Sequence, residues 1–435
     1  MNLAPRLSAG VAVLAAAITT SAIAQTAPAP SASPARGGRG PGVEASVVSA
    51  ARSPEVNADG TITFRLVAPN AKTVRILTDF PKLGDVPVNG AAGFDMTKND
   101  AGVWSYTSPK LAPSYYQYWF VMDGTVLPDP QNTFVRPASG VYKSVVALPG
   151  KDAEWMMFRD VPHGNLTEHH YLNPENKTAR RVVIYTPPDY ATSGQRYPVI
   201  YLLHGANDYE RGWTQTGMAN TIMDNLIADG KAVPAIIVMP FGHDTTGSTG
   251  KLPEVRALQA SLGYTPPARS PGGPPAAGAA PGAGAPGGRG PAPVNPSYME
   301  KDLLGYVIPY VEREFRVIKD KKARAIMGYS MGGGHSTTIG FRHPELFSVV
   351  GGFSGYSRPA AEPLLADPAK ANRDYTLIFI GTGTEDNALT GGRALHAAFT
   401  EKGVKHDWRE DPGYGHDYQI WRIYLRDLAV RMFRE

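Results

Sequence analysis

The chain contains no cysteine among its 435 residues. Disulfide bonds, thiolate nucleophiles and zinc sites built from cysteine are therefore excluded. The histidines show neither an H-x-x-x-H nor an HExxH spacing, so we expect no metal centre and no cofactor. Blocks of basic residues are also absent, and a net charge of +4 argues against nucleic acid as a partner.

Long apolar runs are equally scarce. The clearest one, residues 9–18, follows Arg6 and precedes Ala22-Ile23-Ala24, which has the small-x-small form of a signal-peptidase site. Because this run is much shorter than the ~20 residues of a membrane-spanning helix, we predict a cleavable signal peptide over residues 1–24. The protein is then secreted or periplasmic and has no membrane contact after cleavage; a retained anchor is the alternative. The Ala-, Pro- and Ser-rich residues 25–45 predict a disordered linker.

Residues 46–148 lack histidine, so this segment cannot supply a general base. Its short runs alternate faces with period two, and Asp59-Gly60 and Asp123-Gly124 mark tight turns. The pattern predicts an immunoglobulin-like antiparallel β-sandwich. Trp104 and Trp119 lie in two of these runs. Because aromatic residues that alternate along a strand usually face inward, we expect core residues rather than sugar-stacking platforms.

Residues 155–435 show longer apolar runs that alternate with helical patterns, which predicts a doubly wound α/β domain with a mostly parallel sheet. The expected strands are 181–186, 199–203, 235–239, 325–327, 348–353, 377–380 and 405–409, and the expected helices include 218–229, 303–315, 390–402 and 420–433. Residues 264–296 are almost wholly Pro, Gly and Ala and predict a disordered insertion. A lid or a tether is the alternative role for this insertion.

A short apolar run in this domain ends in the pattern G-x-S-x-G centred on Ser330. Gly328 and Gly332 allow the strand and the following helix to approach closely, and the bend lifts the serine hydroxyl out of the sheet edge. Strand, elbow and helix occur in the order that a nucleophile elbow requires. We therefore predict Ser330 as a catalytic nucleophile.

A serine nucleophile needs a base that is oriented by an acid, in the chain order Ser, Asp or Glu, His. We predict His416 as the base, because it lies in a glycine-rich loop after the last expected strand. Its neighbour Asp417 is expected to cap this loop or to lie on the surface. Glu385 and Asp386 both follow an apolar strand and are both candidates for the acid. The other histidines after the elbow are expected in helices or a strand: His343, His396 and His406.

The oxyanion hole needs two preorganised N–H donors. One is the amide of Met331, the residue after the nucleophile, and the second should follow an early strand. Residues 199–207 form such a strand and loop, so we predict the amide of Ala206 as the second donor, with that of Asn207 as the alternative. His204 is expected to hold this loop in place.

The first segment resembles the early-set modules in front of glycogen-branching enzymes, of the carbohydrate-binding module family 48 type. The residues that carry this resemblance are Phe64-Arg-Leu-Val-Ala-Pro-Asn-Ala71, Gly102-Val-Trp104, Tyr116-Gln-Tyr-Trp-Phe-Val-Met-Asp-Gly124 and Asp129-Pro130.

The second domain is similar to carbohydrate esterase family 1, the feruloyl and acetyl xylan esterases, which have an α/β-hydrolase fold. The motifs are Val161-Pro-His-Gly164, Arg180-Arg-Val-Val-Ile-Tyr-Thr-Pro-Pro188, Leu202-Leu-His-Gly205 with Trp213, Ile308-Pro-Tyr-Val-Glu312, Ala325-Ile-Met-Gly-Tyr-Ser-Met-Gly-Gly-Gly334, Gly352-Phe-Ser-Gly355 and Gly415-His-Asp417. The resemblance implies Asp386 as the acid, because the family's G-x-x-D-like turn matches Gly383-Thr-Glu-Asp386. We also assign substrate contacts to Asn207 and Trp213. The insertion and the Phe241-Gly-His243 loop depart from the family pattern.

These observations predict a secreted serine carboxylesterase that removes feruloyl or acetyl groups from plant cell-wall polysaccharide such as xylan. Its partner is then an acylated polysaccharide or oligosaccharide. Two alternatives stay open. One is a periplasmic siderophore esterase of the enterochelin type, which also joins a β-module to an α/β unit. The other is a noncatalytic carbohydrate-binding protein with a degenerate esterase domain.

The two candidate acids can be separated by substitution. We expect Asp386→Asn to remove most turnover of an aryl acetate and Glu385→Gln to stay near the wild-type rate, because only one of two adjacent carboxylates can orient the imidazole. The reverse order of effects would assign the acid to Glu385.

Overall fold

A computed structural model of the protein describes residues 52–81, 93–138, 141–173, 178–206, 208–243 and 296–434. Four of the sequence-based predictions fall outside these ranges: the signal peptide at 1–24, the linker at 25–45, the insertion up to residue 295, and Asn207. Within the described ranges, no helix combines the length and the apolar character needed to cross a bilayer.

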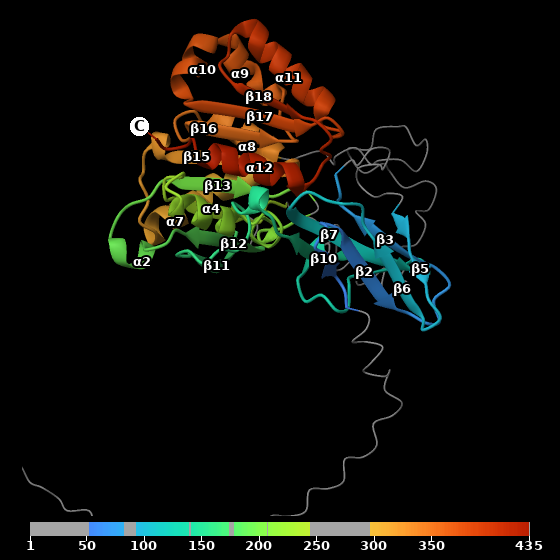
Figure 1. The fold of residues 1–435 in the computed structure, drawn as a ribbon. Helices are drawn as coiled ribbons and strands as arrows, with labels where there is room; N and C mark the ends of the chain where they lie inside the picture. The colour runs from blue at the N-terminus through green and yellow to red at the C-terminus, as the bar shows by residue number, and fades with distance from the viewer. Residues whose placement is uncertain are drawn as a thin grey trace, which may run out of the picture. The chain divides into compact units, whose positions relative to one another are not determined.

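The first module consists of two antiparallel sheets (Figure 1). One has the strand order β1-β2-β6-β5 and the other β4-β3-β7-β10-β9, with β8 paired to β7. Alternate residues of β2 and β7, such as Phe64 and Tyr118, are buried in one core, as the period-two pattern predicts. Trp104 belongs to the same core, which confirms the expectation for this residue; its Nε1 donates to the carbonyl of Ala68 (2.9 Å). The strands are β1 (Glu55–Val56), β2 (Ile62–Val67), β3 (Val74–Thr78), β4 (Phe94–Asp95), β5 (Thr97–Lys98), β6 (Val103–Thr107), β7 (Ser114–Met122), β8 (Thr125–Leu127), β9 (Val135–Ala138) and β10 (Val141–Leu148).

The α/β module is built on one sheet with the strand order β11-β12-β14-β13-β15-β16-β17-β18. The pairs β11–β12 and β12–β14 are antiparallel and the other neighbouring pairs are parallel, so the predicted mostly parallel sheet is confirmed. The sequence does not reveal β11 because this edge strand, NLTEHHYL, lacks an apolar run. The strands are β11 (Asn165–Leu172), β12 (Ala179–Thr186), β13 (Val199–Leu203), β14 (Ile236–Pro240), β15 (Arg324–Tyr329), β16 (Val349–Phe353), β17 (Leu377–Gly383) and β18 (Asp407–Asp411).

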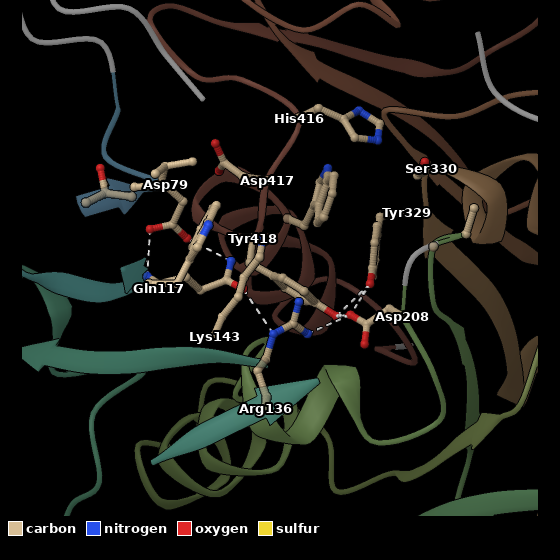
Figure 2. Close-up of a pocket in the computed structure, with 16 residues that line it drawn as sticks. Asp79, Gln117, Arg136, Lys143, Asp208, Tyr329, Ser330, His416, Asp417 and Tyr418 are labelled. Carbon is tan, nitrogen blue, oxygen red and sulfur yellow. Dashed lines mark hydrogen bonds and ion pairs between the residues drawn. The ribbon is translucent and has the colours of Figure 1, made fainter. Parts of the chain in front are cut away.

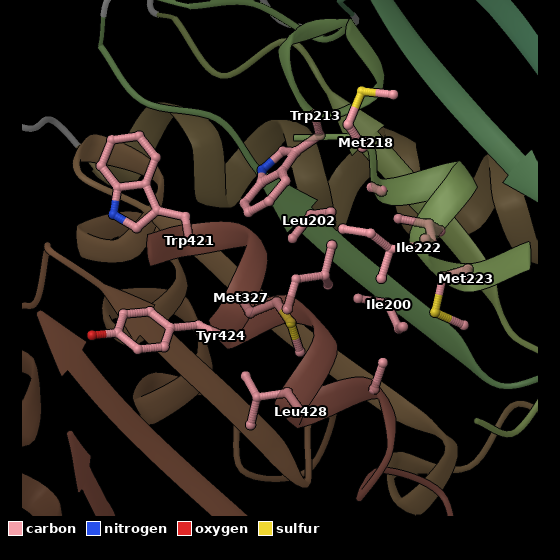
Figure 3. Packing of buried hydrophobic residues seen from close by; sticks show 14 of the residues in the cluster. Ile200, Leu202, Trp213, Met218, Ile222, Met223, Met327, Trp421, Tyr424 and Leu428 are labelled. Atoms are coloured by element: carbon pink, nitrogen blue, oxygen red, sulfur yellow. The ribbon is translucent and has the colours of Figure 1, made fainter. Parts of the chain in front are cut away.

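Helices cover both faces of this sheet. Because successive residues of a strand point to opposite faces, Ile200 and Leu202 of β13 pack with residues of α4 and α12 (Figure 3), whereas Tyr201 and Leu203 pack with residues of α6, α8 and α11. The helix expected at 303–315 is a π-helical turn followed by α7, which has a proline in its first turn. The helices are α2 (Tyr190–Ser193), α3 (Gly212–Gln215), α4 (Ala219–Ala228), α6 (Pro296–Asp302), the π-helix η2 (Leu303–Val307), α7 (Ile308–Glu314), α8 (Met331–Arg342), α9 (Glu362–Ala366), α10 (Pro368–Asp374), α11 (Leu389–Lys402) and α12 (Tyr418–Ala429), with short 3-10 turns at η1 (Lys151–Ala153), η3 (Lys321–Ala323) and η4 (Pro359–Ala361).

The turn between β15 and α8 holds Ser330 at a φ of 53°, in a region that residues other than glycine seldom adopt. Its amide donates to the carbonyl of Phe353 (2.8 Å). The surrounding backbone leaves no room for side chains. A Cβ on Gly355 would lie 1.9 Å from the carbonyl oxygen of Ser330, and one on Gly332 would lie 2.5 Å from that of Leu203. Close packing of three backbone segments therefore fixes the elbow.

Buried polar contacts join the two modules. Nη1 of Arg136 in β9 donates to Oδ2 of Asp208, after β13, over 2.8 Å, and the two side chains are only 5% and 3% exposed. Gln419 and Arg422 of α12 both donate to the carbonyl of Tyr115 in β7, over 2.6 and 2.9 Å. These bonds hold the β-sandwich against α12 and against the loop after β13.

The Arg136–Asp208 pair generates a prediction about stability. In Arg136→Met the carboxylate of Asp208 stays buried without its cation, so we expect the free energy of unfolding to fall by about 3–5 kcal/mol. Urea denaturation measures this change. Arg75→Met is the matched control, because Arg75 pairs with Asp95 at an exposed site of the same module (2.9 Å) and its loss should cost less than about 1 kcal/mol. Equal losses in the two variants would contradict the prediction.

The close packing at the elbow generates a second prediction. Gly355→Ala places a methyl group against the carbonyl of Ser330, so we expect it to lower the free energy of unfolding by about 1–3 kcal/mol and to displace the nucleophile. The control is Gly391→Ala in α11, where a new Cβ meets its nearest heavy atom, on the ring of Tyr356, at 3.7 Å. Both variants are compared by urea denaturation and by turnover of an aryl acetate. Full activity of Gly355→Ala would contradict the expected displacement of Ser330.

Candidate active site

A cavity of about 380 Å³ lies between the two modules. Ser330 and His416 both line it, and in Figure 2 the imidazole of His416 lies on the same side of the cavity as Ser330. The α/β module also contributes Gly205, Ala206, Asp208, Tyr329, Asp417, Tyr418 and Trp421, and the β-sandwich contributes Leu77, Thr78, Asp79, Gln117, Trp119, Arg136 and Lys143. The cavity therefore has one wall from each module.

Asp386, after β17, meets His416, which lies between β18 and α12. Nδ1 of His416 is 3.0 and 3.1 Å from the two carboxylate oxygens of Asp386. Burial tends to raise the pKa of Asp386, but hydrogen bonds from His416, Ser354 and the amide of Ala388 outweigh burial and hold this pKa below its usual value. Asp386 is therefore ionised at neutral pH and can orient the imidazole, which leaves Nε2 of His416 available to a hydroxyl group.

The other candidates for the acid and the base do not line the cavity. Glu385 is exposed, and its amide donates to the carbonyl of Tyr414 (3.0 Å). The rings of His396 and His406 form a hydrogen bond with each other, with Nδ1 of His396 2.8 Å from Nε2 of His406. His343 lies 2.8 Å from a carboxylate oxygen of Glu300. None of these four candidates is among the described residues that line the cavity.

The predicted oxyanion donors lie beside the elbow. Met331 is the first residue of α8, and Ala206 lines the cavity. A Cβ on Gly205 would lie 3.3 Å from Cβ of Ser330, so the loop after β13 packs directly against this serine. His204 holds this loop: its Nδ1 donates to the carbonyl of Gly205 and its Nε2 accepts from the amide of Gly242, both over 2.8 Å. Burial, with repulsion from His243, lowers the pKa of His204 to about 3, so its ring is neutral.

The prediction that Trp213 contacts substrate is wrong. Its side chain is completely buried, and its Nε1 donates to the carbonyl of Leu203 (3.0 Å). The ring packs edge-on against Tyr329 and Tyr418. Trp213 therefore supports Tyr329, the residue before Ser330, and is not among the described residues that line the cavity.

Asp208 is a central residue that the sequence analysis missed. Its Oδ2 accepts hydrogen bonds from Arg136 (2.8 Å), from the hydroxyl of Tyr329 (2.5 Å) and from that of Tyr418 (2.7 Å). Burial opposes ionisation of Asp208, but the charge of Arg136, the nearby His204 and the hydrogen bonds from Tyr329 and Arg136 together outweigh burial and hold the pKa of the carboxyl below its usual value. The position of Asp208, three residues after Gly205, could have indicated its role, because a carboxylate in this loop lies close to the turn that holds Ser330.

The expectation that Trp119 is a core residue is also wrong. Strand β7 carries aromatic residues on both faces, and only Tyr116, Tyr118 and Phe120 point into the sandwich core. Trp119 lies on the opposite face and lines the cavity, with Nζ of Lys143 4.0 Å from the centre of its ring. Because adjacent residues of a strand point to opposite faces, a core position for Tyr118 would have placed Trp119 on the other face of the sheet.

Asp417 has the predicted capping role but not the predicted surface position. It is the N-cap of α12 and its Oδ1 accepts from the amide of Gln419 (2.9 Å). The residue is only 6% exposed and lines the cavity. In the part of the chain that the structure describes, no three His, Asp or Glu side chains gather as metal ligands would.

Known proteins similar to this chain have related architectures. An endo-1,4-beta-xylanase/feruloyl esterase of Xylanibacter ruminicola is 29% identical over 387 residues, which cover 88% of this chain and 46% of that protein, so the chain spans less than half of that relative's length. The crystal structure of an enterochelin esterase of Shigella flexneri has a TM-score of 0.59 and 17% identity, and the match covers 90% of this chain and 98% of that one. The enterobactin esterase FES of Shigella flexneri, in the presence of enterobactin, has a TM-score of 0.57 and 18% identity, and that match covers 85% of this chain and 92% of FES. These two structures show a shared fold.

Family models match both modules. The model of carbohydrate-binding module 48, the isoamylase N-terminal domain, matches residues 50–137. The Esterase model matches residues 174–260 and 289–431, which together are more than half of the chain. Both matches agree with the resemblances stated from the sequence. The chain therefore belongs to the Esterase family and has a family 48-type module before its α/β-hydrolase fold.

Proposed function

We propose that the protein is an exported serine carboxylesterase that hydrolyses feruloyl esters, or the smaller acetyl esters, of plant cell-wall polysaccharide. The observation that carries this proposal is the shared cavity of Ser330 and His416, in which the imidazole is held by the ionised Asp386. A strained elbow, a base and an orienting acid are the parts that acyl transfer by serine requires.

In the first half of the proposed reaction, Nε2 of His416 takes the proton of the Ser330 hydroxyl as Oγ attacks the ester carbonyl. The negative charge that develops on the carbonyl oxygen is stabilised by the amides of Met331 and Ala206. The protonated imidazole, stabilised by Asp386, then gives its proton to the departing alcohol. An acyl group on Ser330 remains.

In the second half, water replaces the alcohol. His416 takes a proton from this water as its oxygen attacks the acyl carbonyl, and the collapse of the second tetrahedral intermediate returns the proton to Oγ of Ser330. The carboxylic acid leaves, and the enzyme regains its starting state. Each turnover consumes one ester and one water and yields one acid and one alcohol.

The substrate class is supported by the relative from Xylanibacter ruminicola, whose name includes feruloyl esterase and whose alignment extends over most of both modules. Export, inferred from the N-terminal segment, suits a polymer that cannot enter the cell. The fold shared with the two esterases of Shigella flexneri keeps a siderophore ester as the second candidate.

A panel of three esters tests this proposal: methyl ferulate, acetylated xylan and a catecholate trilactone. We expect methyl ferulate to exceed the trilactone in kcat/KM by about 100-fold, since hydrophobic pockets discriminate among acyl groups by roughly this factor. Ser330→Ala should lower turnover of methyl ferulate by about 10⁴-fold or more.

The outcomes separate the candidate functions. Preference for the trilactone would assign the siderophore reaction, and preference for acetylated xylan would restrict the acyl group to acetyl. Wild-type activity that persists in Ser330→Ala would overturn the mechanism. Absence of hydrolysis by the wild-type protein would favour the noncatalytic alternative.

A further inference from the structure

One oxygen of the Asp417 carboxyl group accepts a hydrogen bond, and the other has no hydrogen-bond partner among the described residues. Oδ1 caps α12 through the amide of Gln419. Oδ2 is buried and finds no hydrogen-bond partner among the described residues, although the residue lines the cavity. A buried carboxylate oxygen without a donor is costly, so this position favours a bound group that can form the missing bond.

The neighbouring acid on the sandwich wall does not share this property. Both carboxylate oxygens of Asp79 are used by Gln117, whose backbone amide donates to Oδ1 (2.7 Å) and whose Nε2 donates to Oδ2 (2.8 Å). Figure 2 shows Asp417 between Asp79 and His416. Of these two buried acids, Asp417 is therefore the one with an oxygen left for a ligand.

The surroundings of Asp417 favour a neutral ligand. Burial, together with the nearby carboxylate of Asp79, raises the pKa of Asp417 to about 7. The carboxyl group is therefore present in both protonation states near neutral pH, and it can either donate or accept a hydrogen bond. A hydroxyl group matches both states because it is itself a donor and an acceptor. The ammonium of Lys143 over Trp119 opposes a cationic ligand on the same wall.

The position beside His416 identifies which part of the ester lies there. In the proposed reaction the imidazole delivers its proton to the departing alcohol, so the alcohol lies on the His416 side of the ester carbon. Asp417 follows His416 directly in the chain. Trp119, on the sandwich wall of the same cavity, offers an aromatic ring to the apolar face of a sugar.

We propose that Oδ2 of Asp417 binds a hydroxyl group of the alcohol part of the ester, in a subsite for hydroxyl-rich alcohols such as sugars that Trp119 completes. This inference rests on the proposed esterase function and names a specificity residue for it. The bond positions the substrate and takes no part in the proton transfers at His416.

A matched pair of esters tests the subsite: propyl ferulate and glyceryl ferulate, which share a carbon skeleton and differ by two hydroxyl groups. Asp417→Ser retains a capping oxygen for α12 and removes Oδ2. We expect kcat/KM for glyceryl ferulate to fall by about tenfold, mainly through KM, because the substrate hydroxyl is left in a buried site without its hydrogen-bond partner. The loss with propyl ferulate should be smaller by about fivefold or more, because this ester has no hydroxyl group for Oδ2 to bind.

Asp367→Ser is the control variant. Asp367 caps α10 through the amide of Lys370 (2.9 Å) and is exposed, so the same substitution there should leave the ratio of the two esters unchanged. Asp417→Asn keeps both the cap and the side-chain volume. Asp417→Asn replaces the serine variant in the test if that variant does not fold. We expect it to shift the ratio of kcat/KM for the two esters in the same direction by a smaller factor.

Each result decides the inference. Equal losses on both esters would assign Asp417 a structural role and overturn the subsite, as would an unchanged ratio in both variants. A loss that follows the phenolic hydroxyl, seen with methyl ferulate against methyl 3,4-dimethoxycinnamate, would place Asp417 on the acyl side and overturn the assignment to the alcohol. Failure of the wild-type protein to hydrolyse any of these esters would instead overturn the proposed function, and this inference with it.

Discussion

The buried carboxylate of Asp208 holds three parts of the cavity in fixed positions relative to one another. Its Oδ2 accepts hydrogen bonds from Tyr329, which precedes Ser330, from Tyr418, which follows the loop of His416, and from Arg136 of the β-sandwich. A charge removed from water is tolerated only where donors meet it in good geometry. A shift in any of the three segments therefore costs energy at Asp208, and this constraint fixes the elbow, the histidine loop and the sandwich wall relative to one another.

The two walls of the cavity differ in chemistry. The α/β wall carries the groups proposed for bond making and breaking, and it positions them through backbone contacts, as at Ser330 and Gly355. The sandwich wall carries side chains with long polar ends, Gln117 and Lys143 among them. The proposed catalytic groups thus lie on one wall, while both walls contribute polar side chains that a bound molecule can contact.

The fold and the catalytic candidates follow from local sequence patterns, because each depends on short-range features. Ser330 lies in a strand-turn-helix motif, and His416 follows a strand in the expected chain order. Chain order left Glu385 and Asp386 both open, and the family resemblance implied Asp386. The catalytic roles of these residues stay predictions. The role of Asp208 could not be predicted, because its partners come from segments up to 210 residues away. Trp213 was misassigned because a match to a sequence motif does not show whether a side chain is buried. Trp119 was misassigned because aromatic residues occupy both faces of β7.

Strand β7 has a consequence for the evolution of the chain. One face of this strand completes the core of the β-sandwich, and its other face closes the cavity and binds α12 through the carbonyl of Tyr115. Recombination at the short connection between the modules would therefore separate a cavity from its own wall. A foreign sandwich placed before this α/β domain would need to reproduce the outward face of β7 as well as the fold.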